Sequence, residues 1–380
     1  MVVILTNIPT PYRTAFFNQL NLELKNSNTK LHVLYCAKTE PRRFWDFKEE
    51  EQNYDYTFLK GFHPQIKNTY PHINFSVLKE LKKLNPRHLI IAGSWNTPTI
   101  LFALFLYKTK AKKIFWSEGH QDAQRSKSSF ISNLRKSIFK KFDGFLVPNE
   151  NSKEYVYNIV NNRNVSVGFL PNTIDESFFD EELVDSKVNL RKKYRIDISS
   201  RVIVLVSTLS DRKGVFQFIN AFINFSENKR LSYDIFILGT GELQEKIENL
   251  IISKSVTNLH LLGHVNMNQV REVLKMSDIF ALPTKLDPNP LTPIEASFMK
   301  RPLLLSKKAG NFNELLFENT GIAIVEINEK TIEESLNKLD LISDEELKIM
   351  GLNAYNNVVE NFSREKVSIN LIHFLNQLKN

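Results

Sequence analysis

Cysteine and long apolar runs are the scarcest features of this 380-residue chain. Its single cysteine, Cys36, can form no disulfide within the chain, which favours a reducing compartment. The longest apolar stretch, residues 99–107, is far too short to cross a bilayer as a helix. Residues 2–7 lack a basic segment before their apolar run, so they predict a buried strand rather than a signal peptide. We therefore expect a cytoplasmic protein, either soluble or peripheral on the inner face of the cell membrane.

Several signatures of ligand binding are also missing. The glycines of the Gly239-Thr240-Gly241 turn are not followed by the third glycine of a dinucleotide fingerprint or the lysine of a P-loop. The loop with Glu118, His120 and Asp122 has suitable residue types for a metal, but no second cluster completes a site. No Asp-x-Asp pair follows a strand. We expect neither a metal nor another cofactor.

The net charge of +8 is concentrated in the first half of the chain. Residues 1–175 hold 25 Lys/Arg against 14 Asp/Glu, whereas residues 176–380 hold 25 against 28. A basic surface of this kind attracts nucleic acid, anionic lipid or phosphorylated substrates, or is simply solvated. A nucleic-acid-binding protein would interleave aromatic residues with its cations. The phenylalanines of residues 126–142 have core-like spacing instead, so we expect no nucleic-acid partner.

Short apolar runs alternate with helix-period segments along both halves of the chain. In the first half they are residues 2–7, 31–36, 88–93, 112–119, 144–148 and 165–171, and in the second half residues 201–209, 233–243, 259–265, 279–284, 302–306 and 321–326. Continuous apolar strands between helices indicate parallel strands that are covered on both faces. The pattern predicts two doubly wound α/β domains. The tail is helical by periodicity, with a break at Phe362-Ser363 and Ser363 as a helix N-cap.

The loops after strands of the second half contain the best candidates for chemistry, because ligands bind beyond the carboxyl ends of parallel strands. Arg212 and Lys213 precede Gly214 at a strand-to-helix turn, where they either clamp a diphosphate or form an exposed cationic turn. Asp287 and Glu295 lie eight positions apart across a loop that contains three prolines. We expect Glu295 to open a helix, where it binds ribose hydroxyls or only complements the helix dipole.

The first half offers fewer candidates. Residues 6–20 follow the first strand and include Thr10 and Arg13, which could both reach a ligand. Arg13 could instead be only a cation at the start of a helix. Apolar residues of 126–142, among them Phe130 and Leu134, recur at three- and four-residue spacings, and cations such as Arg135 lie between them. The segment is therefore predicted to be a basic amphipathic helix. This helix either contacts an anionic membrane surface or packs on its sheet with a wet basic face.

The order and spacing of five motifs resemble one known family across essentially the whole chain. The motifs are FLPNTID (169–175), STLSDRKGV (207–215), ILGTGEL (237–243), LLGHV (261–265) and SDIFALPTKLDPNPLTPIEASFMKRPLLLSKKAGNFNEL (277–315). In this arrangement the chain resembles the GT-B fold glycosyltransferases of family 4, the retaining group that uses nucleotide sugars.

The resemblance implies a GT-B architecture of two Rossmann-like domains that face each other across a cleft. Residues 1–172 would bind the acceptor, residues 173–360 the nucleotide-sugar donor, and residues 361–380 would form a helix that crosses back to the first domain. The implied reaction moves a sugar from a nucleoside-diphosphate sugar to a glycan or lipid-linked acceptor with retention, and a UDP-sugar is favoured over a GDP-sugar as the donor. Biosynthesis of bacterial surface polysaccharide is the implied setting.

The resemblance also implies roles for individual residues. Lys213 would hold the diphosphate, Glu295 the ribose and Asp287 the donor sugar. Asp287, His120 and Glu118 are the catalytic candidates. His120 would hydrogen-bond a donor sugar oxygen, or it is only a histidine of a surface loop. The other donor-binding candidates are Arg212, Thr208, Gly239, Gly241, Asn289, Leu291 and Thr292.

The chain departs from the family pattern in three places. Asp287 is shorter than the usual glutamate, Thr208 replaces the usual arginine, and Ala309-Gly310 replaces a pair of glycines. These departures leave two alternatives open beside the transferase. One is a nucleotide-sugar epimerase of the same fold. The other is a basic or sugar-binding protein without catalysis.

Overall fold

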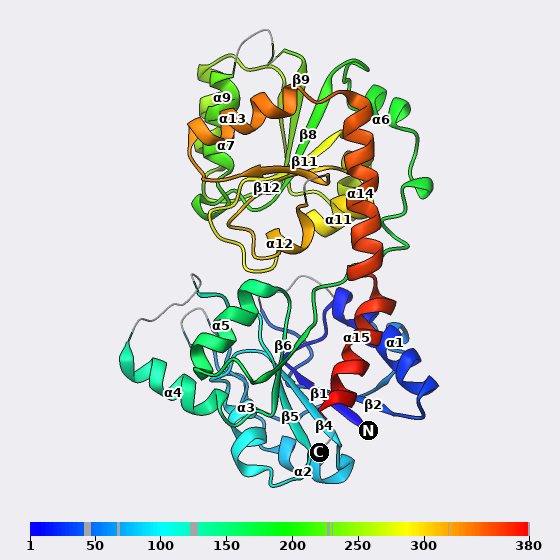
Figure 1. Ribbon diagram of the computed structural model, residues 1–380, viewed down its shortest axis with the longest axis vertical. Coiled ribbons are helices and arrows are strands. Elements are labelled where there is room, and N and C mark those ends of the chain that lie inside the picture. The colour runs from blue at the N-terminus through cyan, green and yellow to red at the C-terminus, as the bar shows by residue number, and fades with distance from the viewer. Residues whose placement is uncertain are drawn as a thin grey trace. The chain divides into compact units, whose positions relative to one another are not determined.

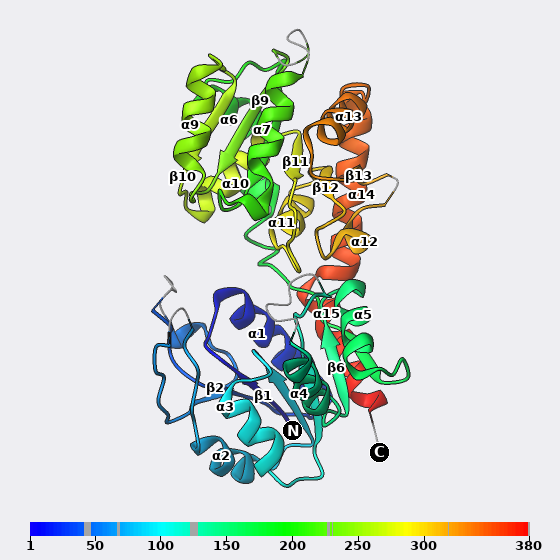
Figure 2. The ribbon, with the colours of Figure 1, turned by 90° about the vertical axis from the view of Figure 1, so that its left-hand side faces the viewer.

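The computed structural model describes residues 1–41, 47–66, 69–121, 128–225, 229, 231–317 and 319–378. The chain divides into two compact units, each with its own sheet. Unit 1 comprises Met1–Ile174 and Ser363–Asn380, and unit 2 comprises Asp175–Phe362. Figures 1 and 2 show the sheet of each unit with its helices.

Unit 1 is built on a seven-stranded sheet in the order β3-β2-β1-β4-β5-β6-β7, and every neighbouring pair is parallel. Its strands are β1 (Val2–Thr6), β2 (Leu31–Tyr35), β3 (Asp55–Phe58), β4 (His88–Ala92), β5 (Lys112–Trp116), β6 (Gly144–Val147) and β7 (Ser166–Phe169). The sequence pattern missed β3, because this edge strand is only partly buried and is no continuous apolar run. The predicted strand 112–119 ends early at Trp116, which leaves Glu118 in a loop.

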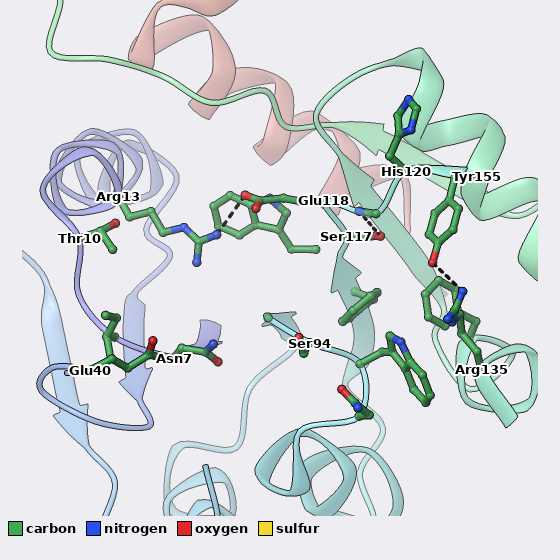
Figure 3. Close-up of a pocket in the computed structure, with 18 of the residues that line it drawn as sticks. Asn7, Thr10, Arg13, Glu40, Ser94, Ser117, Glu118, His120, Arg135 and Tyr155 are labelled. Carbon is green, nitrogen blue, oxygen red and sulfur yellow. Dashed lines mark hydrogen bonds and ion pairs between the residues drawn. The ribbon is translucent and has the colours of Figure 1, made fainter. Parts of the chain in front are cut away.

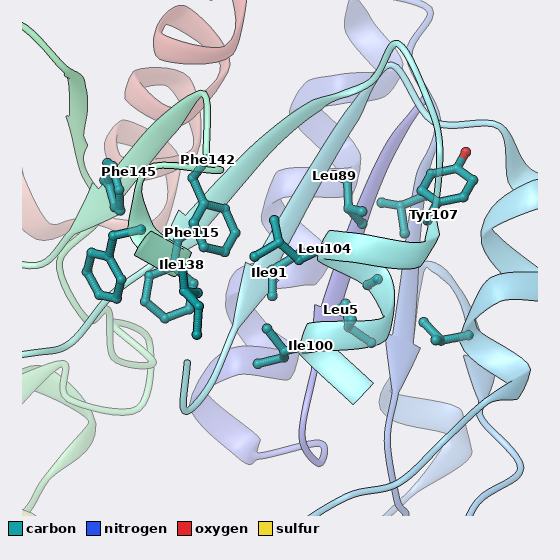
Figure 4. Packing of buried hydrophobic residues seen from close by; sticks show 14 of the residues in the cluster. Leu5, Leu89, Ile91, Ile100, Leu104, Tyr107, Phe115, Ile138, Phe142 and Phe145 are labelled. Atoms are coloured by element: carbon teal, nitrogen blue, oxygen red, sulfur yellow. The ribbon is translucent and has the colours of Figure 1, made fainter. Parts of the chain in front are cut away.

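Helices cover both faces of this sheet. One face carries α1 (Pro11–Asn26) and α15 (Arg364–Gln377), which pack against each other. On the other face lies an apolar cluster whose residues come from the strands and from the second group of helices (Figure 4). These helices are α2 (Ser76–Leu84), α3 (Pro98–Leu101), the π-helix η2 (Phe102–Leu106), α4 (Ser129–Phe139) and α5 (Glu150–Val160). A short turn, η1 (Glu49–Glu51), precedes β3.

Unit 2 has a six-stranded parallel sheet in the order β10-β9-β8-β11-β12-β13. Its strands are β8 (Arg201–Val206), β9 (Tyr233–Leu238), β10 (Leu259–Gly263), β11 (Ile279–Leu282), β12 (Leu303–Ser306) and β13 (Gly321–Ile324). All six correspond to apolar runs expected from the sequence. Two parallel sheets confirm the predicted α/β fold class.

The helices of unit 2 alternate with these strands. They are α6 (Lys187–Lys193), α7 (Val215–Asn224), α9 (Gln244–Ser253), α10 (Met267–Met276), α11 (Thr292–Phe298), α12 (Phe312–Leu315), α13 (Glu329–Asp340) and α14 (Asp344–Phe362), with short turns η4 (Glu181–Leu183) and η5 (Asp211–Lys213). Side chains of α7, α9 and α13 share one buried apolar cluster with the strands. None of the helices that the structure describes is long and apolar enough to span a bilayer.

The chain leaves α14 at Phe362, and α15 starts after Ser363, whose hydroxyl accepts a hydrogen bond from the Lys366 amide as predicted. Two glycines make room for α15 on the sheet of unit 1. A Cβ atom on Gly168 would lie 2.6 Å from the Phe374 ring, and one on Gly144 would lie 3.2 Å from it. Phe374 is 8% exposed. The C-terminal helix is therefore an integral part of the core of unit 1.

Replacing Phe374 by alanine would remove this ring and leave a cavity over the two glycines. We expect Phe374→Ala to lower the free energy of unfolding by about 3 kcal/mol or more, as for other large core truncations. Phe130→Ala is the matched control, because Phe130 is 75% exposed and its loss should change stability by less than about 0.5 kcal/mol. Urea denaturation measures both variants, and equal effects would contradict the proposed packing.

Candidate functional site

Each sheet has one place where the strand order reverses. In unit 1 this place lies between β1 and β4, and in unit 2 between β8 and β11. Loops leave the carboxyl ends of such neighbouring strands in opposite directions, which opens a crevice where ligands of α/β proteins bind. These two sheet edges therefore hold the candidate sites.

In unit 2 the loops after β8 and β11 are joined by an ion pair between the Lys213 ammonium and the Asp287 carboxylate. Both side chains are largely buried, with exposed fractions of 13% and 15%. The loops are also tied through the carbonyl of Arg212, which accepts hydrogen bonds from the Lys285 amide (2.8 Å) and the Thr284 hydroxyl (3.2 Å). The structure thus brings together the two residues predicted to meet the diphosphate and the sugar.

Glycines allow these loops to approach so closely. Gly214 has φ +66° and lies against the carbonyl of Pro283, where any side chain would collide. Gly310 is packed in the same way against the carbonyl of Pro288, and its amide donates to the carbonyl of Asp287 (2.7 Å). The Asp287 amide in turn donates to the carbonyl of Lys308 (3.3 Å), so hydrogen bonds hold the backbone of Asp287 on both sides. The glycine of the Ala309-Gly310 pair is the one that the contact with Pro288 requires.

Glu295 lies in the first turn of α11, which begins at Thr292 and not at Glu295 as predicted. Pro293 fixes the helical backbone already at this first turn. Desolvation raises the pKa of the Glu295 carboxyl to about 7. Among the described residues no side chain or amide donates a hydrogen bond to this carboxyl group. Glu295 is therefore a partly buried acid that could accept hydrogen bonds from a ligand.

The other predicted donor-binding residues occupy the same sheet edge in different ways. Thr208 and Arg212 are both exposed. Gly239 has φ +136° and packs on the carbonyl of Ser207, and Gly241 packs on the carbonyl of Leu209. These two glycines serve the close approach of neighbouring loops.

Asn289, Leu291 and Thr292 lie between the ion pair and Glu295. The Asn289 side-chain nitrogen is buried and has no hydrogen-bond partner among the described residues. Leu291 occupies the N-cap position of α11, and Thr292 is the first residue of that helix. The side chain of Asn311 donates to the carbonyl of Pro290 (2.9 Å), which secures this proline-rich loop from the side of β12.

In unit 1 a cavity of about 820 Å³ lies at the carboxyl ends of β1, β4 and β5 (Figure 3). It is lined by the predicted residues Thr10, Arg13, Glu118 and His120. Asp122 lies outside the described residues. Within the part of the chain that the structure describes, no group of three or more His, Cys, Asp or Glu side chains is placed to hold a metal ion.

Arg13 organises one wall of this cavity. Its guanidinium pairs with Glu118 (3.1 Å), donates to the hydroxyl of Thr6 (2.9 Å) and stacks over Trp116 at 4.6 Å from the ring centroid. Thr10 is 7% exposed, and its hydroxyl has no hydrogen-bond partner among the described residues. Arg13 is thus a wall residue of the cavity as well as a helix-start cation.

The position of Arg135 differs from the one predicted for the basic helix. The sequence pattern placed Arg135 on the wet face, but it is 6% exposed, stacks over Trp95 (5.4 Å) and donates to the Tyr155 hydroxyl (3.2 Å). Conversely, Phe130 and Leu134, expected among the apolar contacts, are 75% and 45% exposed. A buried tyrosine hydroxyl and an aromatic face stabilise the inward arginine, which periodicity cannot reveal. The first residues of the predicted helix lie outside the described ones.

Part of the cavity lining was not predicted from the sequence: Asn7, Glu40, Trp95, Trp116, Arg135 and Tyr155. Trp95 lies in the loop just after β4, so the same strand-end rule applied to residues 93–96 would have found it. Arg135 and Tyr155 come from helices, and no local pattern marks them.

Comparisons with known proteins agree with this geometry. Residues 186–357, within unit 2, match the family model described as "Glycosyl transferases group 1". An Escherichia coli protein named UDP-Gal:alpha-D-GlcNAc-diphosphoundecaprenol alpha-1,3-galactosyltransferase is 27% identical over 202 residues, which are 52% of this chain and 51% of that protein. The uncharacterized glycosyltransferase MJ1607 of Methanocaldococcus jannaschii is 26% identical over 182 residues, covering 47% and 46%. The chain thus spans about half the length of the curated relatives that it matches.

Solved structures resemble the chain over its whole length. A glycosyltransferase from Rickettsia africae has a TM-score of 0.75 at 12% identity, covering 99% of this chain and 98% of that one. Anabaena Alr3699/HepE in complex with UDP has a TM-score of 0.75 at 12% identity, covering 99% of both chains. The fold is that of the GT-B glycosyltransferases, and the matched segment of unit 2 supports a transferase.

The raised pKa of Glu295 leads to a stability prediction. Because its pKa in the folded chain, about 7, lies above the ordinary value of 4.5, folding becomes less favourable as pH rises through this range. We expect Glu295→Gln to be more stable than the parent at pH 8 by about 1–2 kcal/mol and to lose this advantage at pH 4.5. The expected difference is smaller than the full pKa shift implies, because the side chain is partly exposed. Urea unfolding at both pH values, with the exposed Glu242→Gln as control, measures the difference. An advantage that does not depend on pH would contradict the assignment.

Proposed function

We propose that the chain is a hexosyltransferase that moves a sugar from a nucleoside-diphosphate sugar to a glycan or lipid-linked acceptor with retention of configuration. The observation that carries this proposal is the Lys213–Asp287 ion pair at the carboxyl edge of unit 2, with Glu295 on the following helix. The match of residues 186–357 to group 1 glycosyl transferases supports the reaction class. Retention rests on the motif resemblance.

The donor diphosphate would compete with Asp287 for Lys213. A diphosphate carries more negative charge than one carboxylate, so its arrival would draw the Lys213 ammonium away and free Asp287 for the hydroxyls of the donor sugar. The same ammonium and the N-terminal amides of α7 would then stabilise the charge that develops on the departing nucleotide. Lysine and backbone donors supply this positive charge, so the proposed reaction requires no metal.

Glu295 would bind the ribose of the nucleotide. Two neighbouring hydroxyls can donate to one carboxylate, and hydrogen bonds to the charged form favour that form. Nucleotide binding should therefore lower the pKa of this group from its value of about 7 in the free protein. UDP is favoured as the carrier, because the E. coli relative is named for UDP-Gal and the Anabaena structure contains UDP.

The acceptor would bind in the cavity of unit 1. Its charged lining residues include two arginines, Arg13 and Arg135, and two glutamates, Glu40 and Glu118. Such a balanced lining, with aromatic walls at Trp95 and Trp116, suits the hydroxyl-rich and partly apolar surface of a sugar ring. The name of the E. coli relative includes a sugar on diphosphoundecaprenol, which supports a lipid-linked glycan as acceptor and surface polysaccharide as product.

A lipid-linked acceptor would be reached at the inner face of the cell membrane. Phe130 and Leu134 of α4 are exposed, and Lys140 and Lys141 at the end of this helix are exposed as well. Apolar side chains insert at the headgroup boundary, and each cation near an anionic surface contributes about 1 kcal/mol. The proposal therefore includes α4 as a peripheral membrane contact.

Nucleotide binding tests the donor site. Calorimetry without added metal should show binding of one of UDP, GDP and ADP, with a loss of at least about tenfold in affinity for Lys213→Ala and Glu295→Ala. Asp287→Asn should keep or increase this affinity, because it releases Lys213, yet abolish transfer. Asp211→Asn is the matched control, since it breaks the nearby exposed pair with Lys285 (2.6 Å) and should change neither. Absence of binding by every nucleotide would overturn the proposal.

Vesicle flotation tests the membrane contact. The chain should bind vesicles with anionic lipid at low salt and detach as salt rises, because screening weakens the lysine contribution. The double variant Phe130→Ser/Leu134→Ser should lose about tenfold or more in vesicle affinity by removing the inserted apolar groups. Ile252→Ser is the control, since Ile252 is equally exposed (75%) but lies on α9 of unit 2. Equal losses for both variants would contradict the contact.

A further inference from the structure

Three titratable side chains lie in a row that starts at the cavity of unit 1, passes through the buried His72 and ends at the partly buried His63. The Glu40 carboxylate lines the cavity and lies 3.1 Å from Nε2 of His72. Nδ1 of His72 lies 2.9 Å from Nδ1 of His63, and the two rings meet edge to face at 70°. His72 is buried, with 2% of its side chain exposed, whereas Glu40 retains 18%. The proposed donor and acceptor chemistry assigns no role to this arrangement.

The backbone holds His72 in place independently of its ring. The amide and the hydroxyl of Thr99, at the start of α3, both donate to the carbonyl of His72 (3.2 and 2.8 Å). The neighbouring Asn74 side chain donates to the carbonyls of Cys36 (3.0 Å) and Leu59 (3.1 Å), which joins this segment to the loop after β2. That loop continues to Glu40. A firmly held segment therefore presents a buried imidazole to the Glu40 carboxylate at the cavity wall.

The pairing of two Nδ1 atoms restricts where the protons can be. Only one of two facing nitrogens can carry the proton of a hydrogen bond, so the other must be an acceptor. With Glu40 ionised, His72 donates from Nε2 to the carboxylate and accepts at Nδ1 from His63, or donates from both nitrogens as an imidazolium. In either form the Nε2 proton remains on the side of Glu40. The arrangement maintains a donor toward the carboxylate.

Among the described residues, the Cys36 thiol, His63 and Arg13 do not compete for that proton. The Cys36 thiol is buried close to Glu40, and burial raises its pKa to about 12, so it stays neutral. Burial and the neighbouring His72 lower the pKa of His63, which favours its neutral form. Across the cavity, Arg13 is already paired with Glu118.

We propose that Glu40 binds a hydroxyl of the acceptor and that His72, supported by His63, is the positioning residue that fixes the Glu40 carboxylate for this contact. A carboxylate has two oxygens that each accept more than one hydrogen bond, so Glu40 can accept from His72 and from a ligand hydroxyl on the cavity side. This inference rests on the proposed function, because it assumes that the cavity of unit 1 holds the acceptor. It adds a specificity-determining carboxylate that no sequence motif indicated.

Two substitutions of His72 separate its two hydrogen bonds. The amide nitrogen of glutamine reaches about as far as Nε2, and that of asparagine about as far as Nδ1. His72→Gln should therefore keep the contact with Glu40, and His72→Asn should lose it. Assays use UDP-galactose as donor probe and an alkyl-diphosphate-linked N-acetylglucosamine as acceptor probe.

In these assays His72→Asn and Glu40→Gln should each raise the acceptor KM about tenfold, with kcat and donor KM within about threefold of the parent. His72→Gln should rescue the acceptor KM to within about threefold. His32→Gln is the matched control, because His32 bonds Thr57 (2.9 Å) near the amino end of β2 and does not line the cavity. Equal acceptor KM values for the asparagine and glutamine variants of His72 would overturn the proposal.

Nuclear magnetic resonance of the ¹⁵N-histidine-labelled chain decides the positioning role without any turnover. The Nε2–H signal of His72 should be protected from exchange and shift in Glu40→Gln, and its Nδ1 signal should shift in His63→Ala. Insensitivity of the His72 signals to Glu40→Gln would overturn the proposal even if the probes are turned over. Failure of the proposed function would be recognised separately: no nucleotide would bind, while these histidine signals would persist.

Discussion

The ion pair between Lys213 and Asp287 is the interaction on which the arrangement of unit 2 depends. Two largely buried charges stabilise each other at the point where the strand order reverses, and removal of either would leave an uncompensated charge. The glycines at 214 and 310 allow this contact, because they let both loops lie against proline carbonyls. A stable pair of opposite charges is also one that a more strongly charged ligand can open. The same feature thus stabilises the free chain and prepares the proposed donor site.

The two units use charge in different ways at equivalent places of similar sheets. In unit 2 Lys213 and Asp287 lie on loops that backbone contacts fix, with Glu295 on the following helix, which suits a compact, strongly charged diphosphate. In unit 1 each arginine of the cavity stacks on a tryptophan and has a polar partner, Glu118 for Arg13 and Tyr155 for Arg135. Paired cations keep little attraction for a free anion, and the aromatic walls favour a neutral sugar. The proposed division between donor and acceptor follows from this contrast.

Features that depend on a short stretch of sequence could be predicted from the sequence alone. Continuous apolar runs identified all six strands of unit 2, and the spacing of Asp287 and Glu295 around three prolines marked the loop of the ion pair. The edge strand β3 was missed because it is only partly buried, so its pattern is not that of a buried strand. Arg135 was misplaced because helical periodicity cannot foresee a buried tyrosine partner. The Glu40–His72–His63 chain joins three separate segments, and only the folded chain brings them together.

The decisive measurement is a crystal structure of the chain with UDP, grown without added metal. We expect the diphosphate to accept a hydrogen bond from the Lys213 ammonium, Asp287 to have separated from that ammonium, and both ribose hydroxyls to donate to Glu295. UDP bound elsewhere, or at this edge with the Lys213–Asp287 pair intact and the diphosphate out of reach, would contradict the proposed role of the ion pair.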